Sequence, residues 1–414
     1  MIPPLVRPKR KNPLPRTRLP LLPPAARSRA ALGLTAAAAL GYFNLQVCAN
    51  CGAVQYPPRE ACHVCLSLHL SWRTADGLGE LIADTTIRHS HEPFFRKRLP
   101  WRIGMVQLDA GPTVIAHLHS RCAPAPARVR LSARLDKSGQ GVLVAFPIDE
   151  ESNMSNDPRL REMTCHPQFR KVLVTDGKTA VGQALVRALI GAGAEIVWVG
   201  HAQPWHESAG LEELRALPQA TLLPLDVTDS DSVRELAAEI GGRTDILINN
   251  AEIHRTYGIE ACVGIDHARA EMDVNYFGLL RLAQEFGPAM RAHSADGHSN
   301  AVAWVNLLSV FALSNFHAHG TFSASKAAAY SLSQCLRAEM RPAGIRVITV
   351  FPGPLEDEWN QALPPPKLTA EGLARAVVGA LEDGIEDVYP GDFAQEWLAR
   401  WEENSKVLES ELSA

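Results

Sequence analysis

Four cysteines lie close together near the start of the chain, in two pairs of the form Cys-x-x-Cys. The pairs are Cys48 with Cys51 and Cys62 with Cys65. One such turn places two thiolates at two corners of a tetrahedron, and a second turn supplies the other two corners. Because sulfur fills all four positions, none stays open for water or substrate. The spacing predicts a structural zinc site, and we expect His63 to be a bystander.

A second segment combines basic side chains with aromatic ones. Around Phe94, Phe95 and Trp101 the chain carries five cations, namely Arg88, Arg96, Lys97, Arg98 and Arg102. This combination suits a phosphorylated, adenine-bearing ligand such as coenzyme A. It suits a single-stranded nucleic acid equally well, and a solvated charged loop would have the same composition. The residues alone leave these three interpretations open.

The composition is typical of a folded protein with more than one domain. The 414 residues are 46% hydrophobic and 21% charged, which excludes a disordered chain, a collagen and a small disulfide scaffold. Residues 1–150 contain 20 Lys and Arg against 9 Asp and Glu, whereas residues 151–414 contain 21 against 36. Two oppositely charged halves indicate separate domains. No apolar run reaches the roughly 18–20 residues of a membrane helix.

The other four cysteines are scattered singly, at Cys122, Cys165, Cys262 and Cys335. This spacing is poor for a disulfide framework and favours a reducing compartment, so we expect a cytoplasmic protein. The first 30 residues hold eight Lys and Arg, eight Pro and no acidic residue, which faintly imitates a targeting peptide. A basic disordered arm ahead of an Ala-rich helix explains them as well.

Changes in composition and hydrophobic pattern divide the chain. Residues 1–24 are expected to be a disordered, basic, Pro-rich arm, and residues 25–70 a helix over Ala25–Leu40 followed by the cysteine pairs. Residues 149–168 are interpreted as a linker. Within residues 71–148 about five short alternating runs predict a small β-barrel, namely Leu81–Ile87, Ile103–Leu108, Thr113–His119, Val129–Ala133 and Gly141–Ala145.

From residue 169 to residue 414 the pattern becomes an alternation of strands and helices. Ala180–Gly191 has helical periodicity. Buried strands are expected at Lys171–Thr175, Glu195–Val199, Thr221–Leu225, Asp245–Ile248, Ala303–Leu308 and Arg346–Val350. This alternation predicts a doubly wound α/β domain with a mostly parallel sheet.

The first half resembles the acyl-CoA-associated OB-fold proteins, in which a rubredoxin-like zinc ribbon precedes the barrel. The resemblance rests on the cysteine pairs and on further matches at Leu45–Gly52, Gln55–Arg59, Gly77–Gly79, Thr85–Thr86, Pro100–Trp101 and Val106–Pro112. Members of that family commonly serve as partner subunits of thiolase-like enzymes. The resemblance therefore implies an OB-fold and contacts with acyl-CoA or with a thiolase-type enzyme.

The second half resembles the short-chain dehydrogenase/reductase family. The matching pieces are Thr175–Gly182, Asp226–Asp229, Asn249–Ala251, Val274–Asn275, Ser309, Lys326 and Pro352–Gly353. This resemblance implies a Rossmann-like fold and hydride transfer between NADP or NAD and a carbonyl or alcohol carbon. It also implies a homo-oligomer built partly on the helix that carries Lys326.

By the pattern of that family, the catalytic residues are Ser309, Lys326 and Asn275. The Tyr of the YxxxK motif, which exchanges a proton with the substrate, is replaced by Phe322. Phenylalanine has no proton to exchange, and losing a positioned general acid typically costs about 10²–10⁴-fold in rate. Three neighbours with exchangeable protons are expected to pack or to face solvent instead of replacing it, namely His317, His319 and Tyr330.

The resemblance also implies the cofactor-binding positions, which are Thr175, Gly177, Gly182, His201, Asp226, Asn249, Ala251, Lys326, Pro352 and Gly353. Two departures place carboxylates among them. Asp176 replaces the first Gly of the glycine-rich turn, and Glu252 replaces the Gly that closes the Asn-Asn-Ala-Gly run. Both would repel a pyrophosphate. His201 follows the second strand where NAD enzymes carry a carboxylate, which favours NADP over NAD.

Three hypotheses follow. The first is an accessory protein of acyl-CoA metabolism, whose first half contacts acyl-CoA or a thiolase-type enzyme and whose dehydrogenase-like half is impaired in catalysis. The second is an active NAD(P)H-dependent reductase of a β-oxoacyl-CoA or similar carbonyl, using Ser309 and Lys326. A third reading, a single-stranded nucleic-acid-binding protein, is opposed by the acidic second half.

Overall fold

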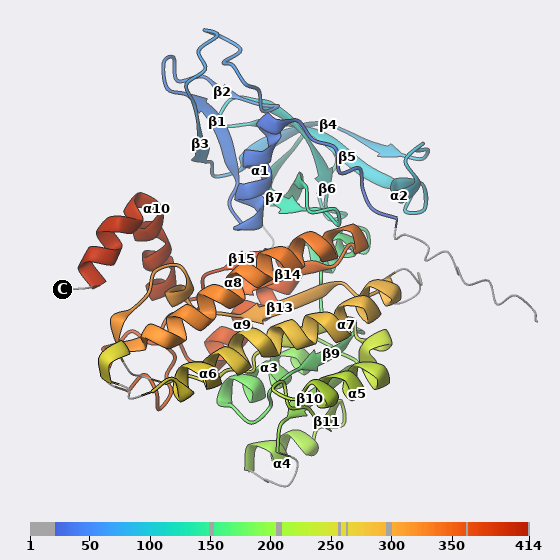
Figure 1. Cartoon of the computed structure of the whole chain (residues 1–414). Helices are drawn as coiled ribbons and strands as arrows, with labels where there is room; N and C mark the ends of the chain where they lie inside the picture. The colour runs from blue at the N-terminus through green and yellow to red at the C-terminus, as the bar shows by residue number, and fades with distance from the viewer. Residues whose placement is uncertain are drawn as a thin grey trace, which may run out of the picture.

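The computed structural model describes residues 21–148, 153–203, 209–255, 258–261, 264–294, 300–361 and 363–412. Figure 1 shows a smaller β-rich body formed by the first half of the chain and a larger α/β body formed by the second half. Most of the arm expected over residues 1–24 lies outside the described residues. Within the described ranges, no helix is both long enough and apolar enough to cross a membrane.

The smaller body begins with α1 (Leu32–Ala39), which a 3₁₀ turn precedes. The expectation of a helix from Ala25 was wrong at its start, because Arg27 reaches the barrel, where it pairs with Asp136 at 3.7 Å, and the chain before Arg29 is not helical. After α1, three antiparallel strands form a ribbon in the order β2-β1-β3, with bounds β1 (Asn44–Cys48), β2 (Val54–Gln55) and β3 (Leu70–Thr74).

Five strands then close a barrel in the order β4-β5-β6-β8-β7. Their bounds are β4 (Leu78–Ile87), β5 (Trp101–Leu108), β6 (Thr113–Leu118), β7 (Ala127–Leu135) and β8 (Gly141–Pro147). Each predicted run coincides with one of these strands. Alternate side chains such as Val106, Val129 and Leu131 fill the interior, which produces the alternating pattern in the sequence. The predicted barrel is confirmed and is consistent with an OB-fold.

The segment between the two bodies is packed against the barrel. It forms two 3₁₀ turns, Met154–Asn156 and Leu160–Met163. Side chains of both turns are buried in one cluster with Trp101 and Phe146 of the barrel. The interpretation of residues 149–168 as a plain linker missed this packing.

The larger body is a doubly wound α/β domain, as predicted. Its seven strands are all parallel, in the order β11-β10-β9-β12-β13-β14-β15. The bounds are β9 (Lys171–Val174), β10 (Ile196–His201), β11 (Ala220–Pro224), β12 (Ile246–Asn249), β13 (Ala303–Leu307), β14 (Arg346–Val350) and β15 (Asp387–Val388). The six predicted strands match, whereas β15 is too short to produce a hydrophobic pattern.

Helices cover both faces of this sheet (Figure 1). One apolar core joins the sheet to α3 (Ala180–Gly191), α4 (Ala209–Arg215) and α9 (Ala370–Asp383). The other core joins it to α5 (Ser230–Ile240), α7 (Leu279–Ser294) and α8 (Gly320–Met340). Before α7 the chain forms α6 (Asp266–Met272) and a π-helical turn (Asp273–Gly278). The last helix, α10 (Asp392–Leu412), is kinked at Asn404.

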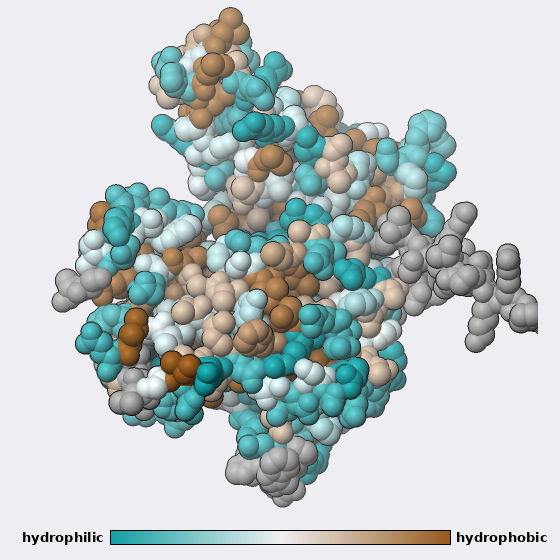
Figure 2. Space-filling view, viewed as in Figure 1, coloured by the Kyte–Doolittle hydropathy of each residue, from teal (hydrophilic) through white to brown (hydrophobic). Residues whose placement is uncertain are grey.

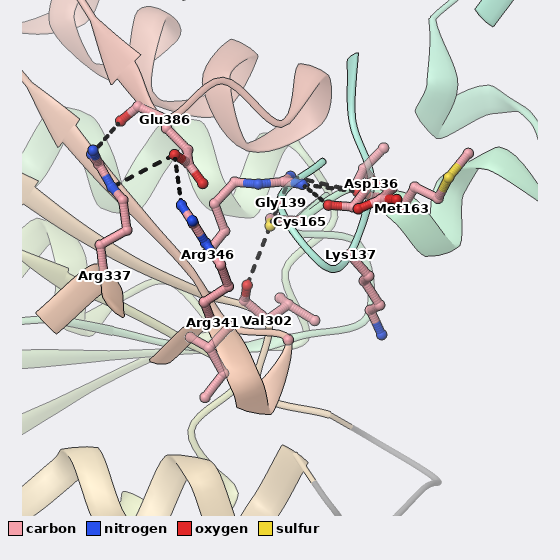
Figure 3. A pocket seen from close by; sticks show the side chains of 13 residues that line it. Asp136, Lys137, Gly139, Met163, Cys165, Val302, Arg337, Arg341, Arg346 and Glu386 are labelled. Carbon is pink, nitrogen blue, oxygen red and sulfur yellow. Dashed lines mark hydrogen bonds and ion pairs between the residues drawn. The ribbon is translucent and has the colours of Figure 1, made fainter. Parts of the chain in front are cut away.

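Arg346 joins the two bodies. It lies on β14, and its buried guanidinium donates hydrogen bonds of 3.0 Å to the carbonyl oxygens of Leu135 and Asp136 at the end of β7. Figure 3 shows Arg346 reaching toward Asp136. Nearby, the backbone N–H of Glu386 donates to the carbonyl of Ala39 at 2.8 Å. A buried guanidinium is costly unless its N–H groups find acceptors, so this contact orients the barrel on the α/β body.

Candidate functional site

The four cysteine sulfurs gather in the ribbon. All four Sγ atoms lie within 4.8 Å of one another, and two pairs, Cys48–Cys65 and Cys51–Cys62, are 3.6 Å apart. Zinc–sulfur bonds of about 2.3 Å in a tetrahedron put sulfurs about 3.8 Å apart. Hydrogen bonding from the backbone N–H of Cys51 is the main reason that the pKa of Cys48 falls to about 6. Nδ1 of His63 lies 3.2 Å from a side-chain oxygen of Gln55 instead. The cysteines therefore fit a structural zinc ion.

Part of the basic and aromatic segment of the barrel is used inside the fold. Trp101 is buried in the cluster beneath the connecting segment. Arg98 forms an ion pair with Glu162 of that segment, and Arg102 pairs with Asp84 at 2.9 Å. These two arginines are therefore engaged with carboxylates, whereas Arg88, Arg96 and Lys97 are exposed, so the three interpretations of this segment stay open.

A more open groove lies between α1 and the ribbon. Its volume is about 340 Å³, and Arg29, Arg59, Glu60 and Trp72 line it. A Cβ at Gly33 would lie 2.2 Å from the indole of Trp72, so glycine is required there. Two arginines beside an indole suit a phosphorylated adenine-bearing ligand. Sequence reasoning missed this groove because its residues come from segments far apart along the chain.

In the α/β body, a hydrogen-bond network ties the carboxyl ends of β9 and β12 together. Oγ1 of Thr175 accepts from the backbone N–H groups of Asn250 at 3.0 Å and Ala251 at 3.1 Å, and it donates to Oδ1 of Asn249 at 3.2 Å. The side chain of Asn250 in turn bonds the backbone of Asp176. Doubly wound sheets bind their ligands at this edge.

The turn between β9 and α3 requires glycine at two positions. A Cβ at Gly177 would lie 2.1 Å from the side chain of Val199, and a Cβ at Gly182 would lie 1.9 Å from the carbonyl oxygen of Asp176. Thr179 caps α3 by accepting a hydrogen bond of 3.1 Å from the N–H of Gly182. The start of α3 is thus tightly built, in the place where Rossmann-like folds hold a pyrophosphate.

Of three polar residues expected near the cofactor, two form hydrogen bonds with neighbouring residues and one has a buried nitrogen without a partner among the described residues. Oδ1 of Asp176 accepts from the N–H of Lys178 at 2.8 Å, and burial raises the pKa of Asp176. Oδ1 of Asp226 accepts from the N–H and the hydroxyl of Thr228 at 2.9 and 2.6 Å. His201 is buried, and its Nδ1 has no partner within the part of the chain that the structure describes.

Lys326 is buried beneath a carboxylate. Its Nζ donates to the carbonyl oxygen of Leu307 at 3.1 Å and lies 2.5 Å from Oε2 of Glu252. The ring of Phe322, one turn earlier on α8, faces the same ammonium at 5.4 Å. The lysine is 2% exposed, whereas Glu252 is 31% exposed, so the carboxylate separates the lysine from the cavity.

Ser309 and Asn275 are held by their own surroundings. Oγ of Ser309, which follows β13, accepts from the N–H of Phe311 at 3.3 Å. Nδ2 of Asn275 donates to the carbonyl of Ile253 and to Oγ of Ser325, both at 2.9 Å. The side-chain oxygen of Asn275 accepts from the N–H of Ile253 at 3.1 Å. Asn275 therefore positions the loop that carries Glu252.

The structure adds one histidine that sequence reasoning missed. His254 is buried, and its ring stacks on Phe322 with centroids 4.0 Å apart. Its Nε2 lies 3.2 Å from Nδ1 of His319, which is also buried. Burial lowers the pKa of both residues, that of His319 to about 4, so both are neutral at pH 7. No motif marks His254. Of the other two neighbours, His317 lies at the surface and Tyr330 packs on Phe351.

Two adjoining cavities lie in front of these residues. The larger has a volume of about 260 Å³ and is lined in part by Asn250, Glu252, His254 and Pro352. The smaller has a volume of about 30 Å³ and adds Ser309, Phe322 and Gly353. Among the described residues, several expected site residues line neither cavity, namely Thr175, Gly177, Gly182, His201, Asp226, Asn249, Ala251, Asn275 and Lys326.

Comparison with known proteins covers both halves. A family model described as short chain dehydrogenase matches residues 170–367. Two further models match the first half: the rubredoxin-like zinc ribbon domain of ChsH2 at residues 35–70 and the C-terminal OB-fold domain of ChsH2 at residues 72–136. These matches confirm the predicted order of zinc ribbon, OB-fold and Rossmann-like domain.

Individual relatives agree with the match of the second half. Short-chain dehydrogenase PC-15 of Penicillium crustosum is 34% identical over 42% of this chain and 66% of its own length. Short-chain dehydrogenase ptmH of Penicillium ochrochloron is 33% identical over 47% of this chain and 70% of its own length. A crystal structure of a short chain dehydrogenase from Burkholderia cenocepacia J2315 in complex with NADP is 31% identical, with a TM-score of 0.54, and the match covers 60% of this chain and 99% of that one.

Proposed function

The chain belongs to the short-chain dehydrogenase/reductase family, and on that premise we propose that it is an accessory protein of acyl-CoA metabolism in which hydride transfer is impaired. The ChsH2-like zinc ribbon and OB-fold contact acyl-CoA or a thiolase-type enzyme. The dehydrogenase-like domain serves as a scaffold and as the unit of a homo-oligomer. The proposal places the protein in the cytoplasm, where thiols stay reduced.

The pairing of Lys326 with Glu252 carries this proposal. In an active member of the family the lysine acts on the catalytic Tyr and on the nicotinamide ribose. Here the Tyr position holds Phe322, and the ammonium is neutralised by a carboxylate 2.5 Å away. The tyrosine of the proton-transferring pair is thus replaced, and the charge of its lysine is neutralised. A carboxylate at this position also opposes an anionic cofactor.

The ribbon offers a surface that suits a protein partner. Val64, Leu66 and Leu68 follow one another around the second cysteine pair and are 63%, 77% and 74% exposed. Figure 2 shows apolar surface at this far end of the smaller body. Neighbouring exposed apolar side chains are typical of docking surfaces. The groove of Arg29, Arg59 and Trp72 is the acyl-CoA contact in this proposal.

Two observations favour the alternative, an active NAD(P)H-dependent reductase of a β-oxoacyl-CoA. The turn between β9 and α3 retains glycine at positions 177 and 182, where a Cβ would lie too close to Val199 and to the carbonyl oxygen of Asp176. A relative 31% identical to this chain was solved in complex with NADP. In this alternative Ser309 orients the carbonyl oxygen, Lys326 leaves Glu252 to contact the ribose, and a water molecule supplies the proton.

Titration of the full-length protein with NADPH and NADH, followed by nicotinamide fluorescence, separates the two. The accessory function predicts no saturation up to millimolar cofactor and no consumption of NADPH with a β-oxoacyl-CoA. Micromolar binding together with turnover that Lys326→Ala abolishes would establish the reductase instead. A Glu235→Gln variant, altered at an exposed carboxylate on α5, controls for the loss of a negative charge elsewhere.

The partner is tested separately, by size-exclusion chromatography with a thiolase-type enzyme. Leu66→Glu combined with Leu68→Glu is expected to prevent co-elution, because it places two charges on the docking surface. Val407→Glu, at an exposed apolar position of α10, is the matched control and should co-elute like the unaltered protein. Co-elution of the ribbon variant would rule out this surface.

A further inference from the structure

Lys137 lies at the junction of the two bodies, and its amine has no partner. It occupies the turn between β7 and β8, directly after Asp136, whose carbonyl oxygen accepts a hydrogen bond from Arg346. The side chain is half-buried, and its Nζ forms no hydrogen bond or ion pair with any residue that the structure describes. Figure 3 shows it pointing away from Arg346 and Glu386, with no interaction drawn to its nitrogen. The junction therefore contains an uncompensated lysine.

The two acidic residues beside Lys137 are engaged with other groups. Oδ1 of Asp136 accepts hydrogen bonds from two N–H groups of its own turn, at 2.8 and 3.0 Å. Oδ2 of Asp136 lies 3.7 Å from Nη2 of Arg27. Glu162 forms an ion pair with Arg98. Neither carboxylate therefore forms an ion pair with the lysine.

The strongest charges that act on this amine are cations. The guanidinium of Arg170 is near enough for its charge to act on Lys137, and among the described residues it donates hydrogen bonds only to backbone carbonyl oxygens. Burial, followed by the charges of Arg170 and Arg98, lowers the pKa of Lys137 to about 8, against the opposing effects of Glu162 and Cys165. The surroundings of the amine therefore carry an excess of positive charge.

An amine in this setting can act as a nucleophile. A lysine is activated when it is desolvated or lies beside another cation, because both effects favour the neutral amine. At pH 8 about half of the Lys137 side chains are neutral, whereas an ordinary lysine with a pKa of about 10.4 is neutral in fewer than about 1% of molecules. The excess of positive charge around the amine also attracts a polyanionic reagent.

We propose that Lys137 is a site of acylation by acyl-CoA. Its Nζ attacks the carbonyl carbon of the thioester, an amide C–N bond forms, and the C–S bond breaks. Coenzyme A leaves as the thiolate and takes up the proton that the nitrogen loses, so the step needs no further reactant. The inference rests on the proposed function, which makes acyl-CoA a ligand of this protein. The amide is neutral, so acylation removes the uncompensated charge from the junction.

Peptide mass spectrometry of the full-length protein treated with acetyl-CoA at pH 8 tests the proposal. Nα-acetyl-lysine amide, added to the same reaction, supplies an ordinary lysine side chain as the standard. The neutral fraction favours Lys137 by about 10²-fold, whereas its lower basicity weakens its nucleophilicity, as it does for thiols, by about tenfold. We therefore expect Lys137 to be acetylated about tenfold faster than the standard.

Two changes of condition connect this rate to the folded site. In concentrated urea Lys137 should react no faster than the standard, because the burial and the neighbouring charges are lost. Between pH 8 and pH 9 the rate at Lys137 should rise only about twofold, against about tenfold for the standard, because Lys137 is already half neutral at pH 8.

A second thioester and a variant complete the experiment. S-Acetyl-N-acetylcysteamine, which lacks the nucleotide and its phosphates, should show a smaller preference for Lys137 over the standard than acetyl-CoA does. Lys97→Arg, altered at an exposed lysine of the first half, is the matched control and should leave the rate at Lys137 unchanged.

Acetylation of Lys137 no faster than that of the standard would overturn the proposal, and so would a rise of about tenfold in its rate between pH 8 and pH 9. An equal preference with both thioesters would overturn the assignment of acyl-CoA as the donor. These outcomes are independent of the nicotinamide titration. NADPH turnover contradicts the accessory function, whereas an unreactive Lys137 contradicts the acylation site alone.

Discussion

Oε2 of Glu252 lies 2.5 Å from Nζ of Lys326, and the lysine is buried behind this carboxylate. The two residues follow different strands, since Glu252 comes after β12 and Lys326 lies on α8, which follows β13. Glu252, which departs from the family pattern, thus neutralises the charge of Lys326, which matches that pattern. Glu252 and Phe322 are far apart in the sequence, yet both departures from the family pattern lie beside the ammonium of Lys326.

Restoring both positions should restore chemistry. We expect Glu252→Gly combined with Phe322→Tyr to raise NADPH-dependent reduction of a β-oxoacyl-CoA at least about 10²-fold above the unaltered protein, because a general acid returns and the lysine is released. The measurement is the rate of NADPH oxidation. Adding Lys326→Ala should cancel the gain. An unaltered protein as fast as the double variant would contradict the prediction.

Loss of zinc should unfold the ribbon. Elemental analysis is expected to find one zinc per chain, and Cys62→Ser should lose it, because three thiolates hold the ion less tightly than four and zinc binding contributes directly to folding. Cys335→Ser, at an exposed cysteine on α8, is the matched control and should retain the zinc. A Cys62→Ser variant with full zinc content would exclude the four-cysteine site.

Replacing Arg346 should loosen the junction between the two bodies. Arg346→Met leaves the buried carbonyls of Leu135 and Asp136 without their donor, so we expect the free energy of unfolding to fall by about 3 kcal/mol. Arg341→Met is the control, because Arg341 is 44% exposed and 3.6 Å from Glu386, and should cost less than about 1 kcal/mol. Denaturant unfolding measures both. Equal losses of unfolding free energy in Arg346→Met and Arg341→Met would mean that the buried contact contributes no more than an exposed one.

The buried histidine pair should make stability depend on pH. Burial lowers the pKa of His319 from 6.5 to about 4, so between these values the unfolded chain binds more protons than the folded one. The free energy of unfolding should therefore fall as pH drops from 6.5 to 4, by at most about 3 kcal/mol for this residue.

His319→Asn should remove that part of the pH dependence, while His317→Asn, at the surface, should keep it. His117, whose pKa burial also lowers to about 4, is present in both variants, so the difference reports on the buried pair of His319 and His254. Unfolding curves at several pH values measure the effect. Parallel pH profiles for the two variants would show that the pair of His319 and His254 does not titrate differently in the folded and unfolded states.

Much of the fold could be predicted from the sequence. Strands such as Arg346–Val350 and the helix Ala180–Gly191 have the predicted bounds, because burial on one or both faces imposes a period on nearby residues. The expected start of the first helix was wrong, because the ion pair of Arg27 with Asp136 links residues far apart in the sequence. The strand β15 has only two residues, which is too short to show an alternation of hydrophobic and polar side chains.

The candidate site likewise has a part that the sequence predicts and a part that depends on tertiary contacts. The spacing of Cys48, Cys51, Cys62 and Cys65 determined a metal site by itself, since two short turns define four ligand positions. The tertiary structure decided how the other polar groups are used. Arg98 pairs with Glu162 of the connecting segment, Arg102 pairs with Asp84, and Glu252 covers Lys326. Each of these outcomes depends on which distant segments the sheet order makes neighbours, and local spacing in a sequence does not contain that information.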